Sequence, residues 1–534
     1  MQPLTSEQQQ WVEKTLSSFT LEERVAQLLQ PKIDNASSVD FLLKTMEKIP
    51  FGGLFVWGAK REEHLVRLAR FQAASRVPIV VAADLENGPG YVVHGAVPFP
   101  DTLAVGAADS EELAYTMGKA AALDGRAAGI HWTFAPVVDV NLNPDNPIAN
   151  TRSLGDNPER IGPLAAAIIR GMQDHGLAAC AKHFPGDGID DVDQHISTSI
   201  NSLSLERWKA ISGRTFNSAF AAEAWSTMIG HIAFPAWDPE KDKRGALRPA
   251  TVSRRIVTDL LRKEMKFDGL IVTDDMNMGG VAGYMNLRDR TVGCIKAGCD
   301  MYLFPLLPYA YDTLLAAVHS GELSEERVTD AARRVLEFKA RLNLHTGQFV
   351  GRMPTTAEQS DFDHAARQIA EKALVCARDV NSILPLRLKP GARVLTVTVT
   401  NDHLDLAEVD QELATRGYRV THIVADHYGC VDKHINEVDA IFVNFTFKAN
   451  WGVGSPRSVG PHNRMFMNGF HMEHPCVLFT SFGSPYHLRQ FSTLPNLINT
   501  HSGSPGSQRA TVAAWFGEIP ITGKSPVGNL ERRF

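Results

Sequence analysis

Closely spaced cysteines are missing from this sequence. Its 534 residues include six cysteines, and no two of them form a Cys-x-x-Cys pair. Disulfide frameworks and zinc sites need cysteines in pairs or at short, regular spacings. We therefore expect reduced, buried thiols. The six positions are Cys180, Cys294, Cys299, Cys376, Cys430 and Cys476.

Long apolar runs and basic clusters are missing as well. No run of about 18 apolar residues occurs. The first residues, MQPLTSEQQQWVEK, are polar and acidic, whereas a secretory signal begins with basic residues and continues with apolar ones. The formal net charge of −6 gives the chain no attraction to nucleic acid or to an anionic membrane. We expect a soluble, cytoplasmic protein that acts on a small neutral molecule, and the sequence leaves its oligomeric state open.

Short apolar runs alternate with helical patterns from about residue 20 to residue 345. The runs are apolar throughout, which is typical of strands covered on both faces, as in a parallel sheet. The stretches between them, such as residues 110–129 and 250–265, begin near serine or threonine and repeat apolar residues at helical spacing. With an eighth strand near Val25 to Gln30, the pattern predicts a (β/α)8 TIM-like barrel. The other seven strands are expected at residues 52–58, 77–84, 131–140, 177–183, 226–231, 269–275 and 299–305.

Polar residues gather at the carboxyl ends of these expected strands. Active sites of such barrels are built at that end of the strands. The spacing therefore predicts one site to which several strands contribute. The residues at strand ends are Asp84, Asp139, Lys182, His183, His231 and Asp274. Trp57, Trp132 and Trp225 lie in or beside strands and are predicted to pack in the barrel.

A second unit follows the barrel. Residues 343–360 are rich in Gly, Thr and Ser and indicate a linker, and a helix is expected over residues 361–379. Strands expected at residues 393–399, 439–447 and 476–482, with helices between them, predict a smaller α/β sandwich domain. The predicted divisions are a barrel over residues 1–345, a linker and helix over 346–385, and the second domain over 386–534. The second domain has no G-x-G-x-x-G motif after a strand, and no G-x-x-x-x-G-K-[ST] motif occurs in the sequence. We therefore expect no nucleotide cofactor.

The loop KHFPGDGIDDVDQH, residues 182–195, is the most unusual segment. As a calcium loop it fails, because Ile196 stands where an EF-hand needs glycine. A zinc site would need a third ligand from elsewhere, so no metal is expected. Asp193 is two residues before His195, a spacing at which a carboxylate can fix one imidazole nitrogen and leave the other to exchange protons with a substrate. Taken singly, Asp187, Asp190 and Asp191 are predicted to be solvated turn residues.

The spacing K-H-F-P-G-x-G, four residues, then D-x-H resembles the signature of bacterial β-N-acetylglucosaminidases (β-hexosaminidases) of glycoside hydrolase family 3. Three further segments resemble motifs of the same family, in the family's order. They are VVAADLENGPG, APVVDVNLNPDNPIANTRSLGDNPE and GLIVTDDMNMGG. The family usually has histidine at the position of Asp187, which leaves the contacts of that loop to be determined.

The resemblance implies roles for individual residues. Asp274 is expected to be the nucleophile and His195 the general acid/base, oriented by Asp193. Hydrogen bonds to the sugar are expected from Asp84, Arg152, Lys182, His183 and His231. From spacing alone, either Asp274 or Asp275 could face the pocket while the other caps the helix that follows. The family also implies that no cofactor is needed and that cytoplasmic cell-wall or chitin fragments are the substrates.

The chemistry of these residue types agrees with the resemblance. Retaining glycosidases use one carboxylate to attack the anomeric carbon and a second group to protonate the leaving oxygen and then activate water. A free histidine titrates near pH 6.5, close to the pH at which one group can do both tasks. The nucleophile must stay ionised, and we expect Lys182, Arg152 or backbone donors to lower the pKa of Asp274.

Three other functions fit parts of the pattern. A phosphorylase would pass the sugar to phosphate, since a neutral imidazole does not repel an incoming anion as a carboxylate does. A non-catalytic sugar-binding barrel would be free to lose one of the catalytic groups, yet all of them are present. A metal-dependent hydrolase would use the strand-end His and Asp residues as ligands and would lose activity on chelation.

Overall fold

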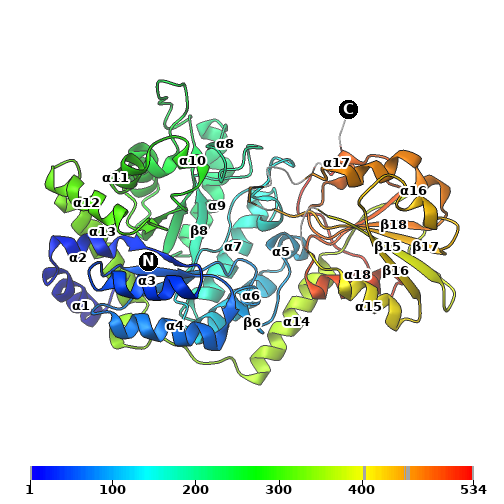
Figure 1. Ribbon diagram of the computed structural model, residues 1–534, viewed down its shortest axis with the longest axis horizontal. Helices are drawn as coiled ribbons and strands as arrows, with labels where there is room; N and C mark the ends of the chain where they lie inside the picture. Colours follow the sequence, from blue (N-terminus) through cyan, green and yellow to red (C-terminus); the bar gives the residue numbers. More distant parts are fainter. Residues whose placement is uncertain (1–2, 401–403, 450, 453–456, 529, 532–534) are drawn as a thin grey trace.

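The computed structural model describes residues 3–400, 404–449, 451–452, 457–528 and 530–531. The chain forms two lobes, which we call the N-terminal and C-terminal lobes, and α14 (Thr356–Lys372) lies between them (Figure 1). Among the residues that are described, no helix is long and apolar enough to cross a membrane.

The N-terminal lobe repeats short parallel strands and longer helices. Strands β8, β10 and β12 form one parallel sheet, and β2, β3, β5 and β7 form another. The strands are β1 (Leu29–Gln30), β2 (Lys32–Ile33), β3 (Gly53–Val56), β4 (Ala59–Lys60), β5 (Val80–Ala83), β6 (Val93–His94), β7 (Trp132–Thr133), β8 (Cys180–Phe184), β9 (Ser199–Ile200), β10 (Ser226–Ile229), β11 (Ile232–Ala233), β12 (Leu270–Thr273) and β13 (Tyr302–Leu303).

Single parallel bridges connect these sheets. Trp132 pairs with Ala178 between β7 and the start of β8, and Val272 pairs with Met301 beside β13. Strand β13 in turn pairs with β1. The carboxyl ends of neighbouring parallel strands therefore meet at one edge. All eight segments expected to be strands contain a parallel strand.

Both faces of the strands are buried, as the apolar runs predicted. In β3, Phe55 packs in a cluster with Trp132, Met228 and Val272, while its neighbour Leu54 packs in a separate cluster with the surrounding helices. Trp132 is fully buried, which confirms its predicted packing role. Trp57 differs from the prediction, because its side chain is 47% exposed.

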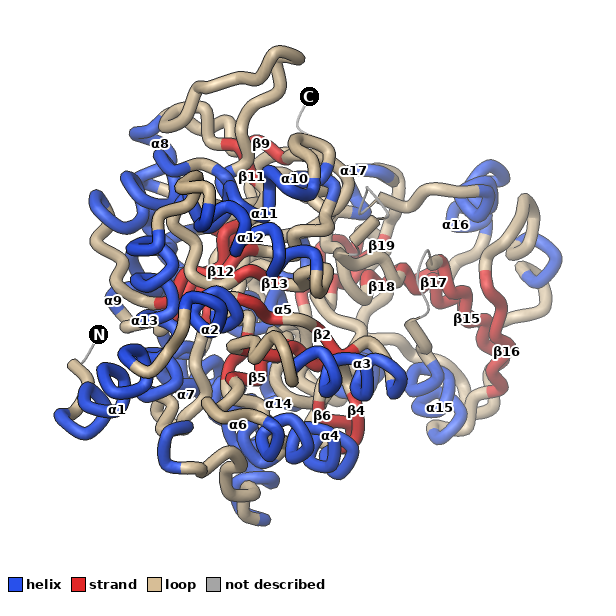
Figure 2. Tube along the Cα trace, turned by 60° about the vertical axis from the view of Figure 1, so that its left-hand side comes forward, coloured by secondary structure: helices blue, strands red, loops and turns tan. Residues whose placement is uncertain are grey.

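Helices surround the strands of the N-terminal lobe (Figure 2). Several begin at the expected caps: the Ser110 hydroxyl accepts a hydrogen bond from the backbone of Leu113 at the start of α6. The segment predicted to be a helix over 250–265 contains a 3-10 helix, η2 (Ala250–Val252), followed by a π-helix, η3 (Arg255–Glu264). The helices are α1 (Ser6–Ser17), α2 (Leu21–Gln27), α3 (Ala36–Met46), α4 (Arg61–Ala74), α5 (Thr102–Ala108), α6 (Glu111–Ala127), η1 (Asn150–Arg152), α7 (Pro158–Gln173), α8 (Leu205–Ala210), α9 (Ser212–Ala221), η2 (Ala250–Val252), η3 (Arg255–Glu264), α10 (Gly279–Ala282), α11 (Leu287–Ala297), α12 (Tyr309–His319), α13 (Glu325–Arg341) and η4 (Leu344–Thr346).

The C-terminal lobe contains one mixed six-stranded sheet in the order β14-β19-β18-β17-β15-β16. Strand β14 runs antiparallel to β19, and the other neighbours are parallel. Its remaining elements are β14 (Val375–Asp379), β15 (Arg393–Val399), α15 (Ala407–Thr415), β16 (Arg419–Val424), η5 (Asp432–His434), β17 (Ala440–Phe445), η6 (Pro461–Asn468), α16 (Phe470–Glu473), β18 (Val477–Ser481), α17 (His487–Gln490), β19 (Asn496–Asn499) and α18 (Pro505–Trp515).

The helix predicted over residues 361–379 is wrong at both ends. Helix α14 begins at Thr356, where the Thr355 hydroxyl and the Glu358 side chain form a capping box. It ends at Lys372, and residues 375–379 form the edge strand β14 because β19 offers them a pairing partner. That partner lies more than 100 residues further along the chain, so local sequence did not indicate it.

Candidate active site

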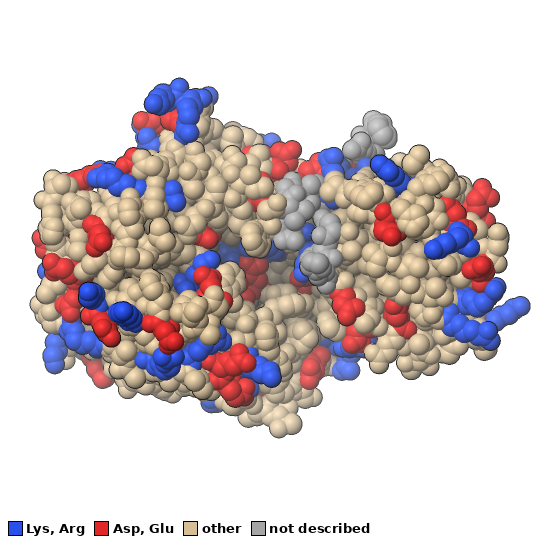
Figure 3. Space-filling view, viewed as in Figure 1, with Lys and Arg blue, Asp and Glu red and all other residues tan. Residues whose placement is uncertain are grey.

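A cavity of about 710 Å³ lies at the carboxyl ends of the N-terminal lobe's strands, beside the C-terminal lobe. The space-filling view shows a hollow between the lobes in which both acidic and basic side chains are visible (Figure 3). Most residues that line the cavity lie in or after β2, β3, β5, β8 or β12. The lining includes Lys32, Trp57, Asp84, Glu86, Arg152, Lys182, His183, His195, Asp274, Asp275, Phe304, Lys448 and Trp451.

A network of four charged side chains occupies one wall of the cavity. The Arg152 guanidinium donates two hydrogen bonds to the Glu86 carboxylate, at 2.7 and 2.9 Å. The Lys182 ammonium lies 2.6 Å from Glu86 and 3.0 Å from Asp84. These residues come from the loop after β5, from η1 and from β8, so the parallel strand ends bring them together.

Mutual attraction fixes the charges of this network. Burial acts to raise the pKa of Glu86, but the positive charges of Arg152 and Lys182 outweigh it and hold the pKa well below its usual range. Burial acts to lower the pKa of Lys182, and the carboxylates of Asp84 and Glu86 raise it instead. The wall therefore offers fixed ionic donors and acceptors, which suits the recognition of sugar hydroxyls.

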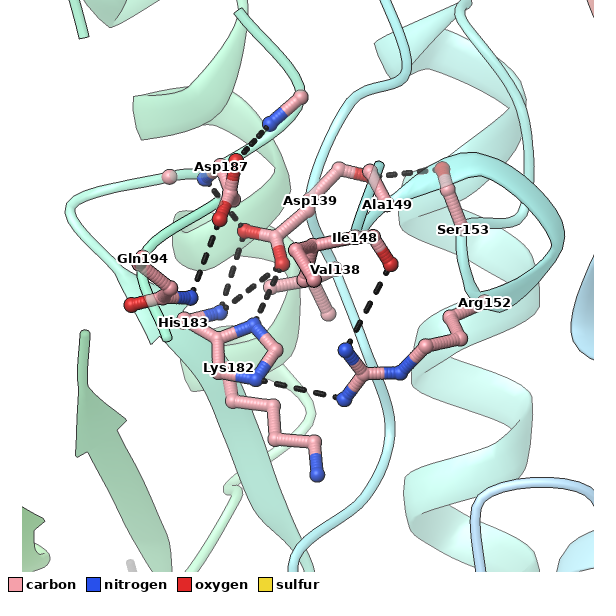
Figure 4. Close-up of polar contacts among 12 residues, drawn as sticks. Val138, Asp139, Ile148, Ala149, Arg152, Ser153, Lys182, His183, Asp187 and Gln194 are labelled. Carbon is pink, nitrogen blue, oxygen red and sulfur yellow. Dashed lines mark hydrogen bonds and ion pairs between the residues drawn. The ribbon is translucent and has the colours of Figure 1, made fainter. Parts of the chain in front are cut away.

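Asp139 binds the Nδ1 side of the His183 ring, and the Nε2 side is directed at the cavity (Figure 4). The Nδ1 atom of His183 lies 2.7 Å from Asp139 Oδ2, and the backbone N–H of His183 donates to the same carboxylate. The Nε2 atom lies 3.5 Å from the Arg152 guanidinium, at the cavity. Asp139 thus orients His183 toward the charged wall.

Asp187 is not a solvated turn residue, contrary to the prediction. Only 1% of its surface is exposed. Its carboxylate accepts a hydrogen bond from the side chain of Gln194 (Figure 4). It accepts another from the side chain of Asn146. Burial and the nearby charge of Asp139 raise the pKa of Asp187 to about 6. At the position where the family usually has histidine, this chain therefore has a buried acceptor that ties the loop to the Asn146 turn.

Asp190 and Asp191, the other two residues predicted to be solvated, fit the prediction better. Asp191 is exposed and Asp190 is half-buried. The Asp190 carboxylate accepts hydrogen bonds from the backbone of Asp191 and Ile200, so it closes the turn.

Asp274 follows β12 directly and faces the cavity. Burial acts to raise the pKa of this carboxyl, but the charges of His183, His231 and His195 outweigh it, and the pKa is lowered. The sequence predicted that Lys182, Arg152 or backbone donors would lower this pKa. Imidazoles lower it in place of Lys182 and Arg152, and a backbone donor contributes as predicted. Asp274 also accepts a hydrogen bond from the backbone of Asp275, at 2.8 Å.

The neighbouring Asp275 has a different environment. Its carboxylate accepts two hydrogen bonds from Asn277, one from the backbone and one from the side chain. Burial raises its pKa. It stabilises the turn after β12 and does not cap the next helix, because α10 begins at Gly279 and its N-cap residue, Met278, accepts no side-chain hydrogen bond.

Asp193 and His195 form the expected pair. His195 Nδ1 lies 2.8 Å from Asp193 Oδ1, and the backbone N–H of His195 donates to the same oxygen. Burial acts to raise the pKa of Asp193, but its hydrogen bonds with His195 and Gly452 lower it. Nδ1 is thus engaged by a carboxylate, which leaves Nε2 of His195 for the cavity that this residue lines.

His231 does not line the cavity with the other expected residues. Its Nδ1 lies 2.7 Å from the Thr251 hydroxyl and its Nε2 lies 2.8 Å from the carbonyl of Asp275. Both ring nitrogens are engaged within the protein, so the geometry does not support the expected contact with the sugar. His231 instead supports the turn that carries Asp274.

Sequence reasoning missed the roles of four contributors to the site. Glu86 is two residues after Asp84 on the same loop, and that spacing was the available signal. Asp139 was recognised at a strand end but was given no role. Trp451 comes from the C-terminal lobe, and its sequence neighbourhood carries no signal. Trp57 was assigned to packing, but it lines the cavity.

Replacement of Glu86 tests the charged wall. Glu86→Gln keeps the shape of the side chain but leaves Arg152 and Lys182 without their shared carboxylate. Loss of one partner of a buried ion pair costs about 3 kcal/mol of stability. We expect a lower Tm in thermal unfolding and a fall in kcat/KM of about 10- to 100-fold. Glu63→Gln, which removes the exposed pair with Arg67, should change neither quantity. Equal effects of both variants would contradict the assignment.

Comparison with known protein families agrees with the site. The model of the glycosyl hydrolase family 3 N terminal domain matches residues 20–338. This is more than half of the chain, so the protein is a glycoside hydrolase. It belongs to glycosyl hydrolase family 3, as the four sequence motifs indicated.

One relative is similar over nearly the whole chain, and another over about half of it. A β-N-acetylglucosaminidase/β-glucosidase of Cellulomonas fimi is 30% identical over 97% of this chain and 95% of its own. A β-hexosaminidase of Pseudomonas aeruginosa is 34% identical over 47% of this chain and 74% of its own.

Two solved structures have nearly the whole fold. The β-glucoside phosphorylase BglX is 28% identical, with a TM-score of 0.89 over 98% of this chain and 97% of its own. A family 3 β-N-acetylglucosaminidase from Paenibacillus sp. str. FPU-7 is 25% identical, with a TM-score of 0.85 over 96% of this chain and 99% of its own.

Proposed function

We propose that this protein is a retaining exo-β-N-acetylglucosaminidase, which removes terminal N-acetylglucosamine from small oligosaccharides. The observation that carries the proposal is the position of the Asp193–His195 pair and of Asp274 around one cavity. The names of the Cellulomonas fimi and Paenibacillus relatives favour the same sugar.

The proposed mechanism assigns two steps to two groups. Asp274 attacks the anomeric carbon while His195 Nε2 gives a proton to the leaving oxygen, which forms a glycosyl-enzyme and releases the aglycone. The now neutral His195 then takes a proton from water, which attacks the anomeric carbon and frees Asp274. Asp193 stabilises the imidazolium and fixes its tautomer. Asp84, Glu86, Arg152, Lys182 and His183 bind the sugar's hydroxyls.

The same proposal covers the architecture that supports the site. We interpret the chain of paired strands in the N-terminal lobe as a (β/α)8 barrel, supported by the shared inner cluster of Phe55, Trp132, Met228 and Val272. The domain divisions at residues 1–345, 346–385 and 386–534 remain a prediction. Strand β14 falls in the middle segment of that division, yet it pairs with the C-terminal sheet. The proposed substrates are fragments of bacterial cell wall or of chitin, and the proposed location of the reaction is the cytoplasm.

Phosphorolysis is a second candidate function. BglX, whose structure covers 98% of this chain, is described as a phosphorylase. Besides Lys182, Lys32 and Lys448 line the same cavity, and the proposed acid/base of this site is an imidazole rather than a carboxylate. Both features reduce the repulsion of an incoming phosphate. Sugar 1-phosphate that forms only when phosphate is supplied would favour this reaction over hydrolysis.

The direct test compares nitrophenyl β-N-acetylglucosaminide with nitrophenyl β-glucoside in buffer without phosphate or added metal. Faster release of nitrophenol from the acetamido sugar, with retention of the anomeric configuration by NMR, is the expected result. Release from the glucoside alone would contradict the proposed sugar. Absence of release from both, with or without phosphate and with or without an added divalent metal, would leave a sugar-binding protein as the remaining interpretation.

A further inference from the structure

The C-terminal lobe touches the acid/base pair directly. The backbone N–H of Gly452 donates a hydrogen bond of 2.8 Å to Asp193 Oδ2. The ring of Trp451 lies 6.0 Å from the ring of His195, centroid to centroid, and is tilted by 37°. The backbone N–H of Ala449 donates to the Thr151 hydroxyl of the N-terminal lobe. We call Ala449, Trp451 and Gly452 the interlobe contact.

The contact completes the hydrogen bonding of a buried carboxylate. Asp193 is only 3% exposed. Its Oδ1 atom receives both hydrogen bonds from His195, whereas its Oδ2 atom receives the one from Gly452. When a buried carboxylate oxygen loses its hydrogen-bond donor, the folded protein loses stability. The carboxylate then tends to move or to become protonated. Without Gly452, Asp193 would lose the partner that fixes its second oxygen.

We propose that Gly452 of the C-terminal lobe is a positioning residue for His195, the acid/base of the reaction, and acts through Asp193. We also propose that Trp451 covers the imidazole ring of His195. The inference rests on the proposed function, since it takes His195 as the proton donor. The hydrogen bond from Gly452 fixes the orientation of the Asp193 carboxylate. In that orientation the carboxylate binds Nδ1 of His195. The acid/base is therefore assembled from both lobes, although His195 and Asp193 belong to one.

The backbone conformation at this position explains the glycine. Gly452 has φ of +78°, a region that glycine enters freely and other residues rarely. A Cβ added there would meet nothing within 4 Å. Asparagine, which tolerates this conformation, should therefore keep the N–H in place, whereas proline has no N–H and cannot adopt a positive φ.

The test separates proton donation from the rest of catalysis. Gly452→Pro is compared with wild type on N,N′-diacetylchitobiose, whose leaving sugar needs a proton, and on dinitrophenyl β-N-acetylglucosaminide, whose leaving group does not. We expect kcat/KM to fall about 10- to 100-fold on the disaccharide and less than about threefold on the dinitrophenyl substrate. Gly452→Asn should recover most of the disaccharide rate.

Two further variants keep the test decisive. Gly417→Pro replaces another C-terminal-lobe glycine of positive φ and removes a backbone hydrogen bond at the end of α15, far from the contact in sequence. It should lower the rates on both substrates equally, if at all. Trp451→Ala, compared with Trp451→Phe, tests the contact without a change of backbone, in case Gly452→Pro does not fold. Trp451→Ala should show the same selective loss on the disaccharide.

Two results would overturn the inference. One is an equal loss on both substrates in Gly452→Pro and Trp451→Ala, which would indicate general distortion. The other is a disaccharide rate that neither variant changes. In both cases the wild-type rates and the Asp274→Asn variant still report on the proposed function. A wild type that hydrolyses neither substrate would refute that function and this inference with it.

Discussion

Asp274→Asn is expected to abolish hydrolysis of every glycoside that the wild-type enzyme cleaves. An amide does not attack the anomeric carbon, whereas the ionised carboxylate, whose pKa the surrounding imidazoles lower, does. Removal of a nucleophile in other enzymes costs about 10⁴- to 10⁶-fold in kcat, and we expect a loss on this scale. The measurement is kcat/KM on nitrophenyl β-N-acetylglucosaminide.

The adjacent aspartate supplies a matched control. Asp275→Asn changes the same functional group one residue along the chain, where the carboxylate stabilises the Asn277 turn. We expect it to retain activity within about tenfold, because a lost turn hydrogen bond costs only about 1 kcal/mol. If Asp275→Asn were the inactive variant and Asp274→Asn the active one, the roles of the two residues would have to be exchanged.

His195→Ala is expected to damage activity selectively. Proton transfer by a positioned side chain contributes about 10²- to 10⁴-fold when the leaving group needs a proton. The loss in kcat/KM should reach this scale on N,N′-diacetylchitobiose and should be small on the dinitrophenyl glycoside. Asp274→Asn, by comparison, should damage both substrates alike. A loss in His195→Ala that does not depend on the leaving group would exclude the role of proton donor.

Local sequence patterns were sufficient to predict much of the site. Asp84, Lys182 and Asp274 were recognised because each follows or ends an apolar run. Parallel strands place their carboxyl ends at one edge, so residues far apart in sequence were expected to meet there. The Asp193–His195 pair was recognised because its two members are only two residues apart. In each case the information lies within a few residues.

The features that were missed depend on contacts between distant segments. Asp187 is buried because Asn146 and Gln194 close around it, which its own charged neighbourhood does not indicate. Trp57 lines the cavity although it follows a buried strand. His231 turns to Thr251 and to the Asp275 carbonyl instead of the sugar site. Trp451 and Gly452 reach the Asp193–His195 pair from the other lobe, across more than 250 residues of sequence.

Covalent capture of the glycosyl-enzyme is the measurement that tests the central claim most directly. The wild-type enzyme would be incubated with a 5-fluoro-N-acetylglucosaminyl fluoride, in which the ring fluorine slows both steps and the good leaving group preserves the first one. Intact-mass and peptide mass spectrometry should then show one sugar per chain, attached to Asp274. A sugar attached to a different residue, or substrate turnover that inverts the anomeric configuration without any adduct, would contradict the mechanism proposed for this site.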